Sequence, residues 1–130
     1  MNAVGLLHKA GTALSSARLL LQSGDSDGSC NRAYYAMFDA ARAALMAFQE
    51  SDEVLTIKTH SGLISNFSLQ LVKPGLIDIE LGKALNKVED LRLIADYKGE
   101  AISLEDAAWA VEQAAAFLAS VRTTFFKNEN

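Results

Sequence analysis

The chain has 130 residues, half of them hydrophobic, and a formal net charge of −4 at pH 7. This length fits one domain with a substantial core, so we expect a single domain over residues 1–130. The acidic balance argues against sequence-independent nucleic-acid binding over the whole surface, which needs many cationic groups, but it leaves room for a local basic pocket.

Cysteine and acidic residues give no metal-site pattern. The single cysteine, Cys30, excludes an internal disulfide and a multi-cysteine site, and we expect it to be a small buried residue. The acidic residues are dispersed, so we predict no metal and no cofactor. No stretch reaches the roughly 20 apolar residues of a membrane span, and the N-terminus lacks a signal-peptide layout. We therefore expect a cytoplasmic protein that does not enter a membrane.

Apolar residues predict two long helices in the first half of the chain. From Leu6 onward they recur at three- and four-residue steps, which predicts an amphipathic helix from about Ala3 to Leu21 that ends at Gly24. After a turn-rich loop, a second helix is predicted from about Ser29 to Gln49. Because this helix is apolar on much of its circumference, we expect it to be the most buried one, or to be buried on two sides.

Three further helices are predicted in the second half. One runs from about Thr59 to Leu71 and ends before Pro74, which interrupts the helical pattern. Another runs from about Ile77 to Tyr97, and the last, from about Leu104 to Phe125, begins at a capping-box variant. Short connections between long helices indicate antiparallel neighbours. The predicted fold is all-α: an antiparallel four-helix up-and-down bundle with an additional short helix.

Three segments resemble one known family. The second helix reads R-A-Y-Y-A-M-F-D-A-A-R-A-A-L from Arg32 to Leu45, which resembles the central helix of HEPN-domain proteins. The segment from Lys58 to Ser65 is similar to the start of that family's third helix. Leu91 to Tyr97, LRLIADY, resembles its "LR-x-x-ADY" ending of the fourth helix. Order and spacing agree from about residue 3 to 125.

The resemblance to short HEPN proteins of toxin–antitoxin type implies a function and several partners. It implies a HEPN-like helical bundle and a homodimer whose subunits pack around a twofold axis. In active family members, an arginine and a histidine with four to six residues between them, contributed by both chains, line a cleft that cuts RNA without a metal. Many relatives work beside a small nucleotidyltransferase, so the resemblance also implies such a protein partner.

The family's catalytic motif is altered in this chain. Arg32 can take the place of the arginine, and the histidine position then falls on Asp39. A second placement is possible at Arg92, with Asp96 and Tyr97 near the histidine position. Neither placement contains a histidine. The resemblance therefore implies RNA binding and a metal-independent endoribonuclease ancestry with an altered catalytic motif.

Asp39 cannot simply replace a histidine. Arg32 and Asp39 are two helical turns apart and project from nearly the same face, together with Tyr35 and Ala36. An aspartate with an ordinary pKa of about 3.9 is an anion at pH 7 and has no proton to give. Asp39 is therefore either the base of a working ribonuclease or, as the chemistry favours, part of an intersubunit Arg32–Asp39 salt bridge. The candidate dimer interface comprises Arg32, Tyr35, Ala36 and Asp39.

Other side chains could bind a ligand or RNA. His60, at the first turn of the third helix, is either a replacement histidine or a surface histidine beside a cap, and Lys58 would add charge there. Tyr35, like Tyr34, either stacks on bases or packs in the core or dimer interface. Arg42 either widens a cationic strip or lies over apolar surface in solvent.

The second placement also has a simple structural interpretation. Arg92 and Asp96 have the spacing of an ordinary ion pair on one helix, and Tyr97 is expected to pack against the second helix. Three functional hypotheses stay open: a toxin-type HEPN protein of ribonuclease ancestry, a non-catalytic module that binds a nucleotide, RNA or a partner protein, and an enzyme whose histidine is His60.

Overall fold

α-Helices make up most of the structure, a computed structural model that describes residues 2–128 and contains no strand in that range. The elements in chain order are α1 (Ala3–Gln22), α2 (Ser26–Gln49), the short 3₁₀ helix η1 (Glu53–Thr56), α3 (His60–Phe67), η2 (Ser68–Val72), α4 (Ile79–Lys98) and α5 (Leu104–Phe125). The predicted all-helical fold, with four long helices and a shorter one, is confirmed.

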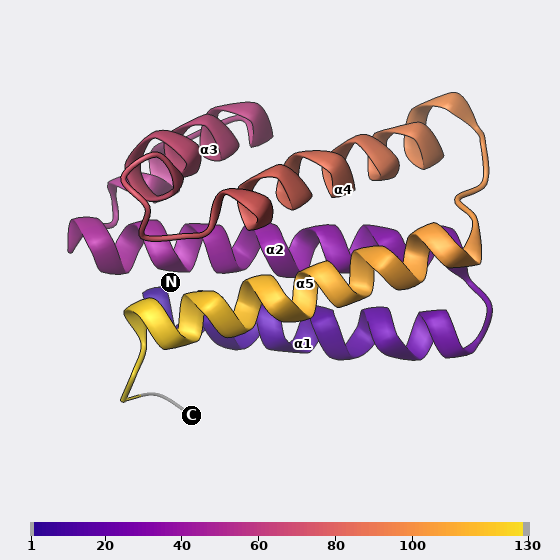
Figure 1. Cartoon of the computed structure of the whole chain (residues 1–130), viewed down its shortest axis with the longest axis horizontal. Helices are drawn as coiled ribbons and strands as arrows, with labels where there is room; N and C mark the ends of the chain where they lie inside the picture. Colours follow the sequence, from indigo (N-terminus) through magenta and orange to yellow (C-terminus); the bar gives the residue numbers. More distant parts are fainter. Residues whose placement is uncertain (1, 129–130) are drawn as a thin grey trace.

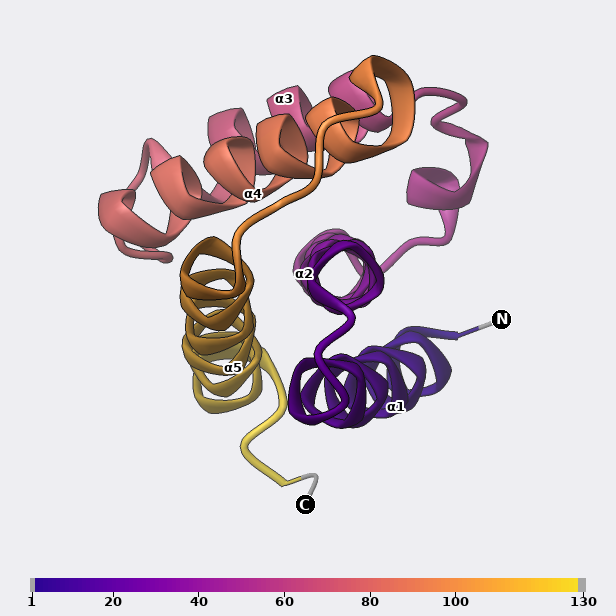
Figure 2. The ribbon, with the colours of Figure 1, turned by 90° about the vertical axis from the view of Figure 1, so that its right-hand side faces the viewer.

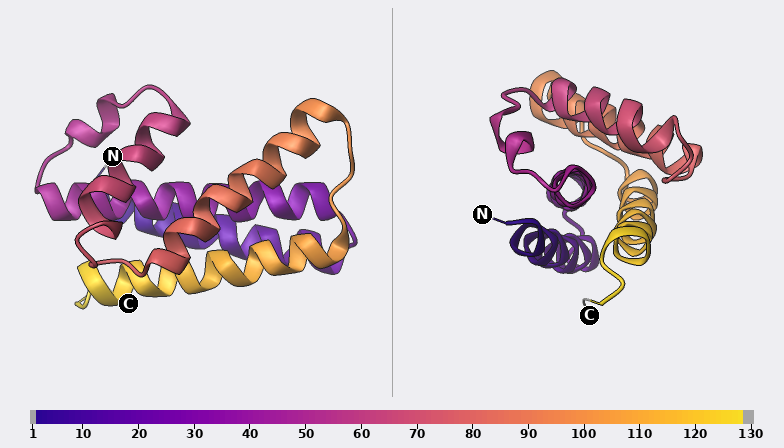
Figure 3. Two further views of the ribbon diagram at one scale, coloured as in Figure 1. Left: turned by 45° about the horizontal axis from the view of Figure 1, so that its top comes forward. Right: turned by 90° about the vertical axis from the view of Figure 1, so that its left-hand side faces the viewer.

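The four long helices alternate in direction, and α2 runs through the middle of the bundle (Figure 1). Viewed end-on, α1 and α5 lie on one side of α2, and α3 and α4 lie on the other (Figure 2). α4 crosses the bundle at an angle, which two further views make clear (Figure 3). None of the helices described for residues 2–128 is both long and apolar enough to cross a membrane.

Alanines explain why α2 is central. Ala33, Ala40 and Ala44 on α2 are fully buried, as are Ala10 and Ala13 on α1. Small side chains let two helix backbones approach closely, so α1 packs along α2 with little between them. The prediction that α2 would be buried on more than one side is confirmed.

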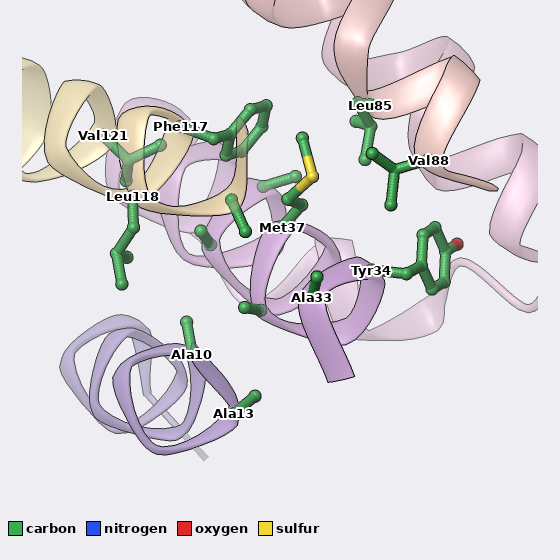
Figure 4. Packing of buried hydrophobic residues seen from close by; sticks show 14 of the residues in the cluster. Ala10, Ala13, Ala33, Tyr34, Met37, Leu85, Val88, Phe117, Leu118 and Val121 are labelled. Atoms are coloured by element: carbon green, nitrogen blue, oxygen red, sulfur yellow. The ribbon is translucent and has the colours of Figure 1, made fainter. Parts of the chain in front are cut away.

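Larger side chains fill the opposite side of α2. Met37, Leu85, Val88 and Phe117 come from three helices and are buried together (Figure 4). In the same view Tyr34 leaves α2 on the side of Leu85 and Val88, with its hydroxyl directed away from the core. The Tyr34 hydroxyl therefore lies between α2 and the two helices α3 and α4.

Helix ends differ from the sequence prediction where polar side chains cap them. α2 begins at Ser26, three residues before the predicted start, because Asp25 Oδ1 accepts a hydrogen bond of 2.8 Å from Gly28 N–H. α4 begins at Ile79, two residues after the predicted start at Ile77, and Asp78 is its N-cap residue. The predicted cap at Ser103 is confirmed, since its Oγ accepts a 3.0 Å bond from Asp106 N–H.

The third helix is the least regular, and its predicted extent of Thr59 to Leu71 was only partly right. The regular α-helix ends at Phe67 and continues as one wider π-helical turn from Ser68 to Val72, before Pro74. The 3₁₀ turn η1 was not predicted because four residues are too few to show a period.

A hydrogen bond between residues far apart in the sequence joins the start of α2 to the loop between α4 and α5. Asp27, in the first turn of α2, accepts a 2.7 Å hydrogen bond from the backbone N–H of Ile102, in the loop between α4 and α5. α4 ends at Gly99, whose φ of 68° lies in the left-handed region that glycine adopts without strain. These two features fix the point at which α4 turns into α5.

Candidate functional site

A pocket of about 270 Å³ opens on the surface shared by α1 and α2. It brings together four side chains that the sequence singled out: Arg32, Tyr35, Asp39 and Arg42. The sequence analysis missed two others, Lys9 from α1 and Phe38 from α2. Only the packing of α1 beside α2 places Lys9 here, so no local pattern could have found it. We call this the basic pocket; its lining residues are Lys9, Arg32, Tyr35, Phe38, Asp39 and Arg42.

Asp39 is the buried carboxylate of the basic pocket. Its side chain accepts a 3.3 Å hydrogen bond from Nη1 of Arg42 in the same chain, and the residue is only 4% exposed. Burial raises the pKa of Asp39 above its ordinary value, although Lys9, Arg42 and Arg32 act in the opposite direction. Arg42 therefore pairs with Asp39 within its own helix, and its guanidinium also lies over the Phe38 ring.

Two other sequence predictions are settled by burial. Ala36 is fully buried within the chain, so its assignment to a candidate dimer interface was wrong: the close approach of neighbouring helices covers it. Cys30 is also fully buried, and burial together with Asp27 raises the pKa of its thiol to about 11. The prediction that Cys30 is a small buried residue is confirmed.

Four rings form a continuous patch next to the basic pocket. His60, at the start of α3, stacks on Phe38 with ring centres 4.4 Å apart and meets the edge of Tyr35 at 5.8 Å. The ring of Tyr34 lies beside the rings of both Tyr35 and His60. We call these residues, Tyr34, Tyr35, Phe38 and His60, the aromatic cluster. Since Tyr35 and Phe38 also line the basic pocket, the two features form one strip along α2.

His60 is held by hydrogen bonds rather than lying loosely beside a cap. Its Nδ1 atom is 2.8 Å from the Tyr34 hydroxyl, which in turn donates a 2.8 Å bond to Oε2 of Glu89 on α4. Burial lowers the pKa of His60, as do the cations Arg92 and Arg42, while Glu89 acts in the opposite direction. His60 thus follows the cap residue Thr59 and stays 39% exposed, while α3 places one face of its ring against Phe38 of α2.

Arg92 lies beneath this cluster. It is 8% exposed, and its guanidinium carbon is 4.6 Å from the centre of the Tyr34 ring and 5.7 Å from that of Tyr35. Nη1 of Arg92 donates a 3.1 Å bond to Asp96, which confirms the predicted ion pair. Tyr97 was expected to pack against α2, but it is 78% exposed, because at its position α4 faces outward.

The strip combines positive charge with flat apolar faces. Lys9, Arg32 and Arg42 surround one carboxylate, so the basic pocket carries more positive than negative charge although the chain as a whole is acidic. Lys58, by contrast, is exposed and is not among the residues that line the pocket. Within residues 2–128, no group of three or more His, Cys, Asp or Glu side chains could hold a metal ion.

Comparison with known proteins gives a consistent result. The HEPN domain family matches residues 3–124. The "UPF0332 protein glr0978" of Gloeobacter violaceus is 38% identical over 115 residues, which are 87% of this chain and 87% of that protein. The "Putative toxin MJ0605" of Methanocaldococcus jannaschii is 31% identical over 109 residues, covering 84% of this chain and 78% of that protein.

A third relative extends the range of source organisms. A "UPF0332 protein" of Thermotoga maritima is 35% identical over 98 residues, which are 75% of this chain and 70% of that protein. The family match spans nearly all of the chain, and the helical bundle agrees with it. The chain therefore belongs to the HEPN domain family and resembles its toxin-type members.

Proposed function

We propose that this HEPN protein binds RNA along the strip formed by the basic pocket and the aromatic cluster, as the RNA-directed component of a toxin–antitoxin pair. One observation carries the proposal: three cations, Lys9, Arg32 and Arg42, share a pocket whose wall includes the rings of Tyr35 and Phe38. Cationic groups bind phosphate, and aromatic faces stack on unpaired bases. Two relatives that are named putative toxins support the assignment to a toxin–antitoxin pair.

Asp39 has a structural role in this proposal. A general base must reach the proton that it removes, and Asp39 is buried and bonded to Arg42. The carboxylate instead holds the Arg42 guanidinium in place and balances part of the pocket's charge. The burial of Asp39 and its bond to Arg42 of the same chain favour this role over a cross-subunit Arg32–Asp39 bridge.

We further propose that the protein is a homodimer in which two copies of the strip face each other across a twofold axis. Arg32 and Tyr35 are half-buried on the outer side of α2 and stay as candidate interface residues. A single copy of the pocket offers few phosphate contacts, whereas two copies facing one cleft would double them. Light scattering at micromolar concentration tests this directly, and a clean monomer would contradict it.

RNA binding is tested with purified protein and a fluorescently labelled single-stranded RNA in the presence of EDTA. Anisotropy gives the affinity at several salt concentrations for the wild type, Arg32→Ala and Arg18→Ala. Arg18 is an exposed arginine of α1 that does not line the pocket, so its variant changes the net charge by the same amount. We expect Arg32→Ala to weaken RNA binding. It should also reduce the slope of log affinity against log salt concentration by about 1. No binding by the wild type, or equal losses in both variants, would refute the proposal.

A second candidate function, binding of a protein partner such as a small nucleotidyltransferase, is favoured by a separate surface. A hollow of about 560 Å³ near the end of α4 is lined by Leu93, Ile94 and Tyr97 between Asp90 and Lys98. Tyr97 is exposed and Leu93 and Ile94 are half-buried, and such aromatic and aliphatic side chains around a hollow are typical of protein interfaces. Co-expression with a candidate nucleotidyltransferase should give a complex that Tyr97→Glu disrupts and Tyr97→Phe does not.

A further inference from the structure

We propose that His60, oriented by Tyr34 and Glu89, is the proton acceptor for metal-independent cleavage of RNA bound at this strip. The inference rests on the proposed RNA binding and adds to it a reactive group that neither placement of the family motif contains. It starts from an arrangement of three side chains on three helices, α2, α3 and α4.

The hydrogen bonds determine which nitrogen of His60 carries the proton. A carboxylate can only accept, so the single hydroxyl hydrogen of Tyr34 points to Glu89. The Tyr34 oxygen can then only accept from His60, which requires a hydrogen on Nδ1. In neutral imidazole the other nitrogen, Nε2, is left with a free lone pair. The chain Glu89–Tyr34–His60 thus selects the tautomer in which Nε2 is a base.

The surroundings of His60 keep its ring in place and available. Phe38 stacks on one face of the ring, and the Tyr34 hydroxyl anchors one edge. Nε2 forms no hydrogen bond with any residue in the part of the chain that the structure describes, and 39% of the side chain is exposed. A nucleophile–base–orienting-group arrangement of this kind is the general pattern by which enzymes activate a hydroxyl.

The charged groups that face His60 favour the neutral ring. Arg92 and Glu89 face it from α4, and Arg42 and the Tyr34 hydroxyl from α2. The two arginines disfavour a charged imidazole, and Glu89 favours it, with burial adding to the effect of the arginines. Near neutral pH the ring is therefore ready to accept a proton.

The basic pocket lies next to this base. Phe38 is shared between them: its ring stacks on His60 and also lies under the Arg42 guanidinium, 5.7 Å from the ring centre. The Arg42 charge also acts on the His60 ring, so we infer that a phosphate bound at Arg42 brings the adjoining ribose within reach of His60. Arg42 would also offset the negative charge that develops on the phosphate during reaction.

The reaction balances without a metal or another reactant. Nε2 takes the proton of an RNA 2′-hydroxyl, and the 2′-oxygen forms a bond to the adjacent phosphorus. The bond from phosphorus to the 5′-oxygen breaks, and that oxygen leaves with a proton from water. The products are a 2′,3′-cyclic phosphate and a 5′-hydroxyl end, and the imidazolium returns its proton to solvent.

The experiment measures binding and cleavage separately. Labelled RNA is incubated with the wild type, His60→Gln or His8→Gln in EDTA, while anisotropy reports affinity. His8 is an exposed histidine on α1 and serves as the matched control. We expect cleavage by the wild type and by His8→Gln, and a loss of about 100-fold or more in His60→Gln with RNA affinity retained. RNA with a 2′-deoxy group at the cut site should be bound but not cut.

A positioning role for Tyr34 and Glu89 has its own readout. Glu89→Gln removes the charge that favours protonated His60, so the acidic limb of the rate–pH profile should move to lower pH. A purely structural role would not move this limb. If the limb stays in place, the positioning role of Glu89 is refuted.

The tautomer can be observed without any activity. Long-range ¹H–¹⁵N correlation spectra distinguish Nδ1–H from Nε2–H imidazole, and His8→Gln assigns the remaining signals to His60. We expect Nδ1–H in the wild type at pH 7.5 and a mixture in Tyr34→Phe. An Nε2–H ring in the wild type would overturn the inference. So would tight RNA binding without cleavage, which leaves the proposed function intact, whereas absence of binding refutes both.

Discussion

Asp39 and Arg42 form an ion pair within one turn of α2, with Oδ1 of Asp39 and Nη1 of Arg42 3.3 Å apart. This pair decides the character of the basic pocket. The Asp39 carboxylate is buried, and the pair holds one of the three cations of the pocket, Arg42, beside it. Asp39 is therefore part of the pocket's charge balance.

Removing the charge of Asp39 should strengthen RNA binding. Asp39→Asn leaves Lys9, Arg32 and Arg42 without their counter-charge, and a surface-type charge interaction is worth about 1 kcal/mol, or roughly fivefold in affinity. Anisotropy titrations measure the change. Glu105→Gln, at an exposed position in the first turn of α5, is the control for net charge. Equal gains in both variants would mean that the pocket has no special role.

Arg92 should matter for stability more than a surface arginine does. Arg92→Ala removes a desolvated cation from the Tyr34 ring and opens a cavity, so we expect a loss of about 2 kcal/mol in the free energy of unfolding. The Asp96 pair adds little, because Asp96 is exposed. Urea denaturation checks this, with Arg92→Lys expected between wild type and Arg92→Ala. A loss below about 0.5 kcal/mol, the range of surface substitutions, would contradict the prediction.

Stability should depend on pH through His60. Its pKa in the folded chain lies below the ordinary value of 6.5, so the unfolded chain binds more protons just below that pH. The free energy of unfolding should therefore be highest above pH 6.5 and decrease as the pH is lowered from there. Denaturation midpoints from pH 7.5 to 5.5 should show a smaller decrease in His60→Gln than in His8→Gln. Parallel curves would show that another group is responsible.

The bond from Ile102 to Asp27 should stabilise the turn between α4 and α5. Asp27→Ala leaves the N–H of Ile102 without its acceptor, which costs about 1–3 kcal/mol for a buried group. Asp27→Asn keeps an acceptor oxygen and should recover most of the loss. Thermal unfolding of the two variants measures the difference. If both lose the same amount, the charge of Asp27 at the start of α2 matters more than the bond.

Local patterns in the sequence determined the helices and the family. Apolar residues at three- and four-residue steps indicate helices, and the apolar circumference of α2 predicted the most buried helix, or one buried on two sides. Three segments in register, Arg32 to Leu45, Lys58 to Ser65 and Leu91 to Tyr97, together indicated a HEPN domain. Helical spacing also predicted the Arg92–Asp96 pair, because residues four apart on a helix are neighbours whatever the rest of the chain does.

Only the tertiary structure decided what the site residues contact. Lys9 reaches the basic pocket because α1 packs along α2, and His60 reaches Tyr34 across 26 residues because α3 folds back over α2. Neither contact leaves a trace in local spacing. Asp39 shows the same division: its place on one face with Arg32 follows from helical geometry. Its bond to Arg42 joins residues three apart on one helix, but its burial follows only from the packing of the neighbouring helices.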